Sequence, residues 1–560
     1  MSAQVDITSG AYEQGSKGLK GGALGLLSSV VIGVSSTAPG YSIAATLGGV
    51  VALVAFQAPA VMILAFVPML FIAYAYREMN RVAPDCGTTF TWATKAFNPW
   101  VGWMGGWGII AADVVVMASL SQIAGIYGFL LFGQDDLANN KLAVTAVGCL
   151  WIVALTYVCY RGIEVSAKFQ FVMLAVEVVV LVVFSVVALA KVYTGNGGAN
   201  AVKPSLSWFN PLNIVGDSGG FSFATMSSAV LLAVFIYWGW DSAVSVNEET
   251  KDPATTPGRA AVISTVILVL TYAIIAVAAV SFNGTDSLAG QSDVLGVLGG
   301  EVLGSPLDKI LILAVLTSAA ASTQTTILPT ARTTLSMAAY QALPATFSKV
   351  HPRFFTPTTS TIAMGGISII FYVVMAALSD NILADSALAV GLLIAFYYGL
   401  TGFASAWYFR DDRGQGFRDL NARIIMPLLG GLILLAAFIT TLIQNANADN
   451  SATQINLFGW ETGGVFVISV GALLVGVVLM LVSRLRSPAF FSGAVLNRHT
   501  VVQVFESEPI TEVEALVPGL PDAPSQEQTV VPPLTVEQLR EAQAEARHEV
   551  RDERAAGDAD

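Results

Sequence analysis

Residues 35–40 of this chain read SSTAPG and residues 237–241 read YWGWD, and each motif interrupts an apolar segment of membrane-spanning length. The first segment covers residues 24–54, and the second is the sixth such segment, beginning near residue 223. A broken helical backbone is tolerated in a bilayer only where it lines a cavity or is buried in protein. Matched breaks in two halves of a chain are therefore typical of a transporter's substrate site.

The composition is typical of a membrane protein. Of its 560 residues 54% are hydrophobic and 12% are charged, whereas soluble domains contain roughly 25% charged residues. Between residues 24 and 484 we count about twelve apolar segments, each long enough to cross a hydrocarbon core of about 30 Å as a helix. The predicted fold is an all-α polytopic membrane protein with breaks in its first and sixth helices.

The charges divide the chain into three parts. We expect a leader over residues 1–23, a transmembrane core over 24–486 and an acidic tail over 487–560, which carries most of the net charge of -12. Most core lysines and arginines fall on one side of the predicted spans, and the exceptions are Lys141, Lys191, Lys203 and Lys309. By the positive-inside rule, both termini should be cytoplasmic in a multi-pass protein of the plasma membrane.

The two breaks expose complementary backbone groups. The outer half of the first span would point its N-terminal amides inward, and these groups bind carboxylates. The break in the sixth span would expose carbonyls that accept from an ammonium group. The predicted amides are those of Ser36, Thr37 and Ala38, the carbonyls are those of Phe235, Ile236 and Trp238, and Trp238 and Trp240 could stack on the substrate or gate it. Alternatively, Pro39 and Gly239 only kink packed helices.

Three acids lie within predicted spans: Asp113 in the third, Glu177 in the fifth and Asp241 in the sixth. Each costs about 2.5–3.5 kcal/mol at a helix centre, so intramembrane acids are usually functional. No lysine or arginine lies at similar depth to pair with them. Such a carboxyl can load and release a proton, bind a cationic substrate group or bind a metal cation. The structural alternative is a neutral carboxyl hydrogen-bonded to a neighbouring helix.

The eighth span is rich in hydroxyl side chains between residues 317 and 326. Ser322 and Thr323 could line the substrate path or, with first-span carbonyls, bind sodium. Hydroxyl and small side chains also pack membrane helices against one another, so this interpretation stays open.

Motifs of soluble enzymes are missing from the sequence. Residues 15–17 read GSK, where a phosphate-binding loop needs Gly-Lys-Ser/Thr after a strand, and the chain has no HExxH motif. His351, His499 and His548 all lie outside the spans, which argues against a histidine-bound metal. We therefore expect no enzymatic activity, cofactor, resident metal or nucleic-acid partner.

The sequence resembles the amino acid-polyamine-organocation (APC) superfamily of transporters over roughly residues 20–486. The most specific stretches are FIYWGWD at 235–241 and EETKDP at 248–253, in the form seen in the cationic amino-acid transporter branch. The entry to the third span and the end of the eighth are also similar to the family's motifs. The residues are Pro84, Gly87, Phe90, Phe97, Pro99, Trp100, Gly102, Trp107 and Arg332. The resemblance implies a five-plus-five inverted repeat plus two helices, with alternating access coupled to protons or to a second substrate.

Two positions depart from the family pattern. The family's Gly-Ser-Gly-like break appears here as Ser36-Thr37-Ala38, and Glu177 stands where some members carry a lysine linked to proton coupling. The expected function is proton-coupled uptake of amino acids, with Asp241 and Glu177 handling protons and Asp113 able to read a positive side chain. Sodium coupling, transport of a polyamine or other amine, and a nutrient sensor that signals through its tail are the alternatives.

Overall fold

The computed structural model describes residues 17–216, 219–291, 293–378, 380–411, 416–457 and 459–502. The chain divides into two compact units, Met1–Ser507 and Glu508–Asp560. The second unit, and with it most of the predicted acidic tail, lies outside the described residues, as does the leader before residue 17.

Among the described residues, eleven helical ranges are long and apolar enough to cross a membrane. One of them, Leu26–Val82, has 57 residues, which would make a helix of about 85 Å against a hydrocarbon core of about 30 Å. It holds two spans, so the prediction of about twelve is confirmed. The helices are α1 (Leu26–Ser36), α2 (Pro39–Val54), α3 (Ala58–Val82), α5 (Pro99–Leu131), α7 (Lys141–Tyr160), α8 (Ile163–Tyr193), α9 (Phe223–Val234), α10 (Ser242–Ser245), α11 (Thr256–Asn283), α13 (Asp308–Ala339), α14 (Thr358–Leu378), α15 (Asp380–Tyr408), α17 (Met426–Asn445) and α18 (Gly464–Arg486).

Short elements connect the spans. A two-stranded antiparallel hairpin pairs Gln454 with Gly463 and Leu457 with Trp460. The short α-helices are α4 (Thr89–Ala96), α6 (Asp135–Ala138), α12 (Val294–Leu303), α16 (Phe417–Leu420) and α19 (Pro488–Phe491), and the hairpin is β1 (Gln454–Leu457) and β2 (Trp460–Gly463). Single turns are η1 (Ala55–Gln57), η2 (Leu206–Phe209), η3 (Pro211–Asn213), η4 (Phe235–Tyr237), η5 (Asn247–Glu249), η6 (Ala345–Ser348), η7 (Asn421–Ile425, a π-helix) and η8 (Ala448–Asn450).

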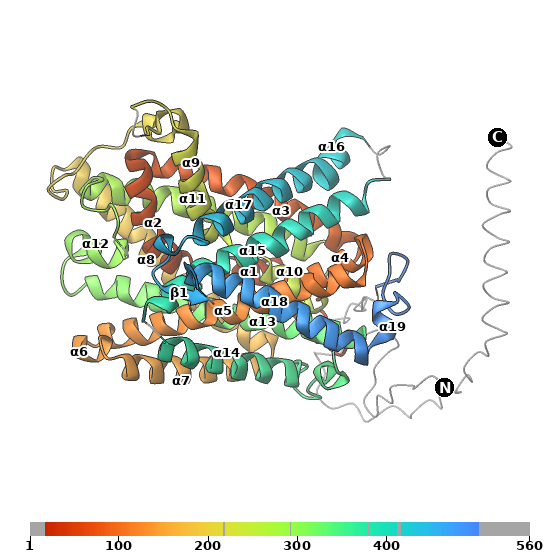
Figure 1. The fold of residues 1–560 in the computed structure, drawn as a ribbon. Coiled ribbons are helices and arrows are strands. Elements are labelled where there is room, and N and C mark those ends of the chain that lie inside the picture. Colours follow the sequence, from red (N-terminus) through yellow and green to blue (C-terminus); the bar gives the residue numbers. More distant parts are fainter. Residues whose placement is uncertain are drawn as a thin grey trace, which may run out of the picture. The chain divides into compact units, whose positions relative to one another are not determined.

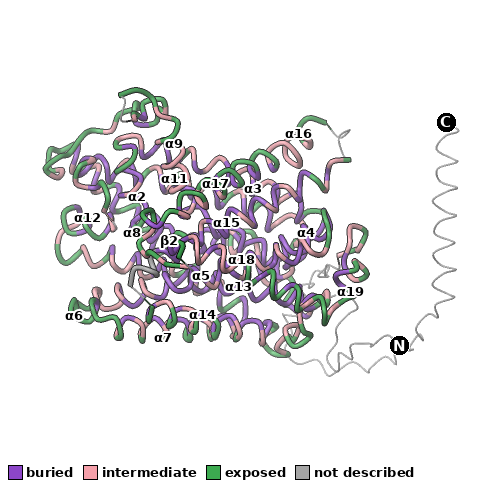
Figure 2. Tube along the Cα trace, viewed as in Figure 1, coloured by how far each residue is buried: buried purple, intermediate pink, exposed green. Residues whose placement is uncertain are grey.

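Burial separates central helices from peripheral ones. Nearly all of α13 from Thr317 to Ala338 is buried, although it is rich in hydroxyls. By contrast, α7 leaves Leu142 and Leu150 exposed, as expected for a helix that faces lipid. Figure 2 shows this contrast between the buried segments near α5, α13 and α15 and the exposed margin along α7 and α14. The polar residues of α13 therefore belong to the protein interior.

The described end of the leader and the residue that follows it, Leu24, pack against one end of the helix bundle, which we call the leader face. Leu24 donates its amide to the Glu249 carbonyl at 2.9 Å, and its carbonyl accepts from the Lys251 amide at 2.9 Å. The α3–α4 connection lies at the same face, because Lys17 binds Asp85 there. Figure 1 shows α4, α16 and α19 at one end of the bundle and α6, α9 and α12 at the other.

Two short segments also pack on this unit. α4 contains Lys95, which is only 5% exposed and whose ammonium donates to the Thr500 carbonyl. Phe490 stacks on Phe90 with ring centroids 5.5 Å apart. The first residues beyond 486, assigned to the tail, are thus part of the packed structure.

Candidate functional site

The breaks in the first and sixth spans touch each other. α1 ends at Ser36, Ala38 has a left-handed backbone with φ of 46°, and α2 begins at Pro39. In the sixth span the chain turns at Gly239, where φ is 116°. A Cβ atom added to Gly239 would lie 2.7 Å from the Ser36 carbonyl oxygen. Only glycine fits both this conformation and this close approach.

Hydroxyl groups join three helices at the same point. The Ser36 and Ser242 hydroxyls are 2.8 Å apart, and the Ser322 hydroxyl donates to the Ser36 carbonyl at 2.9 Å. Ser322 therefore ties α13 to the break. Thr323 instead donates to Ala319 within its own helix at 2.7 Å. The structure brings Ser322 to the site, whereas the Thr323 hydroxyl bonds inside α13.

The amides that the sequence predicted as a carboxylate site already have partners. Thr37 donates to Val34 at 3.2 Å and Ala38 donates to Ser35 at 3.1 Å, which extends α1 by a turn.

The amide at the start of α2 faces a side chain. Gly40 donates its amide to Glu177 Oε1 at 2.6 Å, and Glu177 Oε2 has no hydrogen-bond partner among the described residues. The next amide, of Tyr41, donates to the Ser318 hydroxyl at 3.3 Å. Pro39 at the first helical position was the signal for this, because the free amides of a helix follow such a proline. The anion position at this N-terminus is therefore filled by Glu177.

The carbonyls predicted to bind an ammonium group are partly engaged. The Ile236 carbonyl accepts from the Tyr272 hydroxyl at 2.7 Å, and the Phe235 carbonyl accepts from the Trp238 amide at 3.1 Å. The Trp238 indole donates to the Tyr397 hydroxyl at 2.5 Å. The break is thus held by tyrosines from α11 and α15.

Asp241 lies in an aromatic enclosure. Its carboxyl accepts from Tyr398 at 2.8 Å and from Tyr397 at 3.2 Å, and the residue is 2% exposed. Trp240 packs against the rings of Tyr76 and Tyr398, each with centroids 5.1 Å away. Sequence reasoning missed the two tyrosines of α15, because nothing in their spacing shows which helix they face.

The other intramembrane acids are separated around the site. Asp113 on α5 accepts from the Thr330 hydroxyl of α13 at 2.6 Å, close enough to Asp241 to interact electrostatically. Glu177 extends from α8 to the first turn of α2, away from the other two acids. Among the described residues no ion pair links Asp113, Glu177 or Asp241 to a basic side chain.

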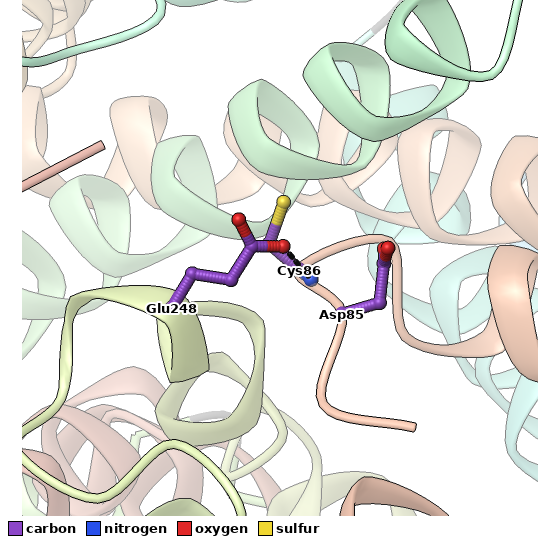
Figure 3. Close-up of side chains that lie close together, drawn as sticks. All are labelled: Asp85, Cys86 and Glu248. Atoms are coloured by element: carbon purple, nitrogen blue, oxygen red, sulfur yellow. Dashed lines mark hydrogen bonds between the residues drawn. The ribbon is translucent and has the colours of Figure 1, made fainter. Parts of the chain in front are cut away.

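A separate charged cluster lies at the leader face. Figure 3 shows the carboxyls of Asp85 and Glu248 beside Cys86, and one ligand atom from each residue lies within 4.8 Å of the others. Such a group could hold a cation, but the Lys17 ammonium already binds Asp85 at 2.7 Å and Glu248 at 2.5 Å. Although burial opposes it, the Lys17 charge lowers the pKa of Asp85 to about 2. We call Lys17, Asp85 and Glu248 the latch.

A buried ion pair lies next to the latch. Arg332 donates from Nε to Glu249 Oε2 at 2.6 Å and from its terminal nitrogen to Oε1 at 2.8 Å. Both side chains are at most 2% exposed. This bidentate geometry ties α13 to the segment that follows the sixth span.

Within the described residues, the membrane-length helices, the two broken helices in contact and the buried carboxyls beside the breaks define a polytopic membrane transporter rather than an enzyme. The chain belongs to the amino acid permease family, whose model matches residues 24–471. The predicted membership of the APC superfamily is thereby confirmed.

Several characterised and uncharacterised transporters are similar to this chain. An uncharacterized transporter of Mycobacterium tuberculosis is 28% identical over 74% of this chain and 85% of its own length. The low-affinity putrescine importer PlaP of Escherichia coli is 23% identical over 76% of this chain and 88% of its own length. The branched-chain amino acid permease BcaP of Bacillus subtilis is 26% identical over 55% of this chain and 65% of its own length. These relatives include both amino acid and polyamine permeases.

Proposed function

We propose that this permease imports an amino acid together with a proton by alternating access, in a plasma membrane and with both termini cytoplasmic. The observation that carries the proposal is the hydrogen bond from the Gly40 amide to the Glu177 carboxyl, at the point where the two broken helices meet. In this proposal the Glu177 carboxyl takes the helix end that a substrate carboxylate would need.

The two carboxyl groups would compete for one helix end. The positive N-terminus of α2 favours an anion, and the ionised Glu177 supplies it when the site holds no substrate. A protonated Glu177 is a weaker acceptor, so a substrate carboxylate can then take the amides of Gly40 and Tyr41 and approach residues 36–38. Proton binding would thus favour substrate binding, which is the thermodynamic requirement for symport.

The rest of the site would receive the substrate's amino group. The ammonium would lie near Asp241 and the carbonyls of Phe235, Ile236 and Trp238, after the tyrosine hydroxyls give way. Trp238 and Trp240 would restrict access to the site on the side of Tyr76 and Tyr398. Asp113 would bind a cationic substrate side chain. Ser322 and Thr323 keep a role as path-lining residues or, if sodium replaces the proton, as ligands beside the first break.

An amine without a carboxylate is the second possible substrate. It is favoured by the bonded amides of Thr37 and Ala38 and by three buried carboxyls without a basic partner among the described residues. A polyamine would need only the carboxyls. The similarity to a putrescine importer supports the same possibility.

Uptake into proteoliposomes tests the proposal. We expect accumulation of amino acids under an inward proton gradient without sodium, abolished by a protonophore. Glu177→Gln should lose gradient-driven accumulation and keep substrate exchange, and Asp241→Asn should do the same. The exposed Glu164→Gln is the control.

Competition with decarboxylated analogues separates the two substrate classes. If amines inhibit uptake and amino acids do not, the substrate lacks a carboxylate. Accumulation at the normal level in both variants would refute proton handling by these carboxyls, and sodium-dependent uptake would refute proton coupling.

A further inference from the structure

Five buried residues on α8, α1 and α13 carry polar side-chain atoms without partners in the described part of the chain. The atoms are the hydroxyls of Ser35 and Ser166, one oxygen of Glu177 and both amide atoms of Gln170 and Gln324. All five residues are fully buried, and none of these atoms has a hydrogen-bond partner among the described residues. Native proteins leave few buried polar groups unpaired and usually satisfy them with water.

Three of these residues share one face of α8. Ser166, Gln170 and Glu177 lie within about 40° of one another around the helix at 3.6 residues per turn. The remaining surface of this half of α8 faces outward, because Phe171 and Val172 are more than half exposed. The polar residues therefore form a stripe that points at α1 and α13, which both pack against α8.

The stripe begins at the leader face. The first turn of α8 is placed there by the ion pair between Lys20 and Glu164 at 2.9 Å. Just inside it, the Cys159 thiol donates to the Gln324 carbonyl at 3.4 Å, and the side chains of Ser166 and Gln324 both approach that thiol. From Ser166 the stripe runs about 16 Å along the helix axis to Glu177.

We propose that this stripe is a hydrated passage that carries protons between Glu177 and the leader face. The inference rests on the proposed function of Glu177. The proton leaves the Glu177 carboxyl for the nearest water, each water passes one proton onward by exchanging O–H and hydrogen bonds, and one proton is released at the leader face. The Glu177 carboxylate that remains is free to accept again from the Gly40 amide.

The glutamines would hold the waters in line. An amide offers both donors and acceptors but does not itself titrate, so it can orient water without trapping the proton. Gln170 and Gln324 are thus positioning residues. Substrate would use a different route, because the groups proposed to bind its amino group, including Asp241, lie on the α15 side of the break.

The chain carries a built-in probe for this passage, because Cys159 is one of only three cysteines. In a Cys86→Ala/Cys149→Ala protein, N-ethylmaleimide should alkylate Cys159 in the native transporter, since the reagent needs a water-accessible thiolate. Gln170→Leu should slow this alkylation at least about tenfold, whereas Gln122→Leu on α5 should not.

Transport gives the second measurement. Gln170→Leu and Gln324→Leu should reduce proton-driven accumulation about tenfold or more and leave substrate exchange within about twofold of the parent, while Gln122→Leu changes neither. Equal loss of accumulation and exchange, or a Cys159 thiol that reacts only after denaturation, would overturn the proposal. If the parent protein shows no proton-driven accumulation, the proposed function fails, and the Cys159 labelling alone decides whether the passage is hydrated.

Discussion

Replacing Lys17 with methionine should open the leader face. The ammonium bridges Asp85 at 2.7 Å and Glu248 at 2.5 Å, so it joins the described end of the leader to the α3–α4 connection and to the exit of the sixth span. These segments have to separate if the permease opens on this side. Lys17→Met keeps the length and apolar stem of the side chain and leaves two neighbouring carboxylates without their shared cation.

The size of the effect follows from the surroundings of the latch. Removing one partner of a buried ion pair costs about 3–5 kcal/mol. The lower end applies because Asp85 keeps four other donors, from Gly87, Thr91, Ser336 and Tyr340. The fall in the pKa of Asp85 from 3.8 to about 2 corresponds to roughly 2.5 kcal/mol. A change of about 3 kcal/mol raises the open fraction by roughly 100-fold.

Alkylation of Cys86 reports this opening. The thiol is buried beside the latch and donates to the Arg332 carbonyl at 3.4 Å. In a Cys149→Ala/Cys159→Ala background, Lys17→Met should raise its rate of alkylation by about two orders of magnitude. Burial, and after it the Glu248 charge, raise the pKa of Cys86, while Lys17 acts against them. Removing Lys17 would therefore slow the reaction of the closed state, so faster labelling can only come from opening.

Lys20→Met is the matched control. Lys20 pairs with Glu164, but both side chains are about half exposed, and such surface pairs contribute about 0–1 kcal/mol. Labelling of Cys86 should stay at the rate of the parent. An unchanged rate in Lys17→Met, or an equal increase in both variants, would refute the latch.

Three further outcomes are expected. Between pH 5 and 8 the open fraction measured with Cys86, corrected for thiolate, should stay constant, because Asp85 stabilises the latch above about pH 4 and loses this only as the pH falls toward 2; a pH-dependent opening in this range would contradict it. Gly239→Ala should abolish transport, since φ is 116° and the new methyl would overlap the α1 break, while Gly366→Ala, with nothing within 4 Å, should transport normally. Glu249→Gln should lower the thermal midpoint by leaving the Arg332 charge buried and unpaired, at a cost of about 3–5 kcal/mol, and the double change of both residues to methionine should restore much of it; a double variant as unstable as the single one would disprove this account.

Much of the fold could be predicted from local sequence. Apolar runs of membrane length predicted twelve spans, because a bilayer leaves only helices or closed barrels as solutions for the backbone. Pro39 and Gly239 predicted the two breaks, because proline and glycine change the backbone conformation only within a few residues of their own position. The exact residues were harder to predict. The free amides of the outer half-helix were expected at Ser36, Thr37 and Ala38, whereas α2 begins at Pro39 and it is the Gly40 amide that donates to the Glu177 carboxyl.

The partners of the site could not be predicted in this way. Tyr397 and Tyr398 reach Asp241 from a helix more than 150 residues away in the chain, and half a turn of rotation of α15 about its axis would have pointed them elsewhere. The latch likewise joins three segments that lie far apart in the chain. In the sequence, Lys17 was noted only because residues 15–17 resemble a phosphate-binding loop without matching it.

By itself, the sequence determined that this chain spans a membrane, where its helices break and which acids lie at membrane depth, because hydrophobic length, backbone strain and buried charge are properties of single segments. Only the tertiary structure decided that the two breaks touch, that Glu177 fills the anion position of α2 and that Lys17 pairs with Asp85 and Glu248 at the leader face. These features depend on helix rotation and packing, which arise when distant segments compete for the same interior.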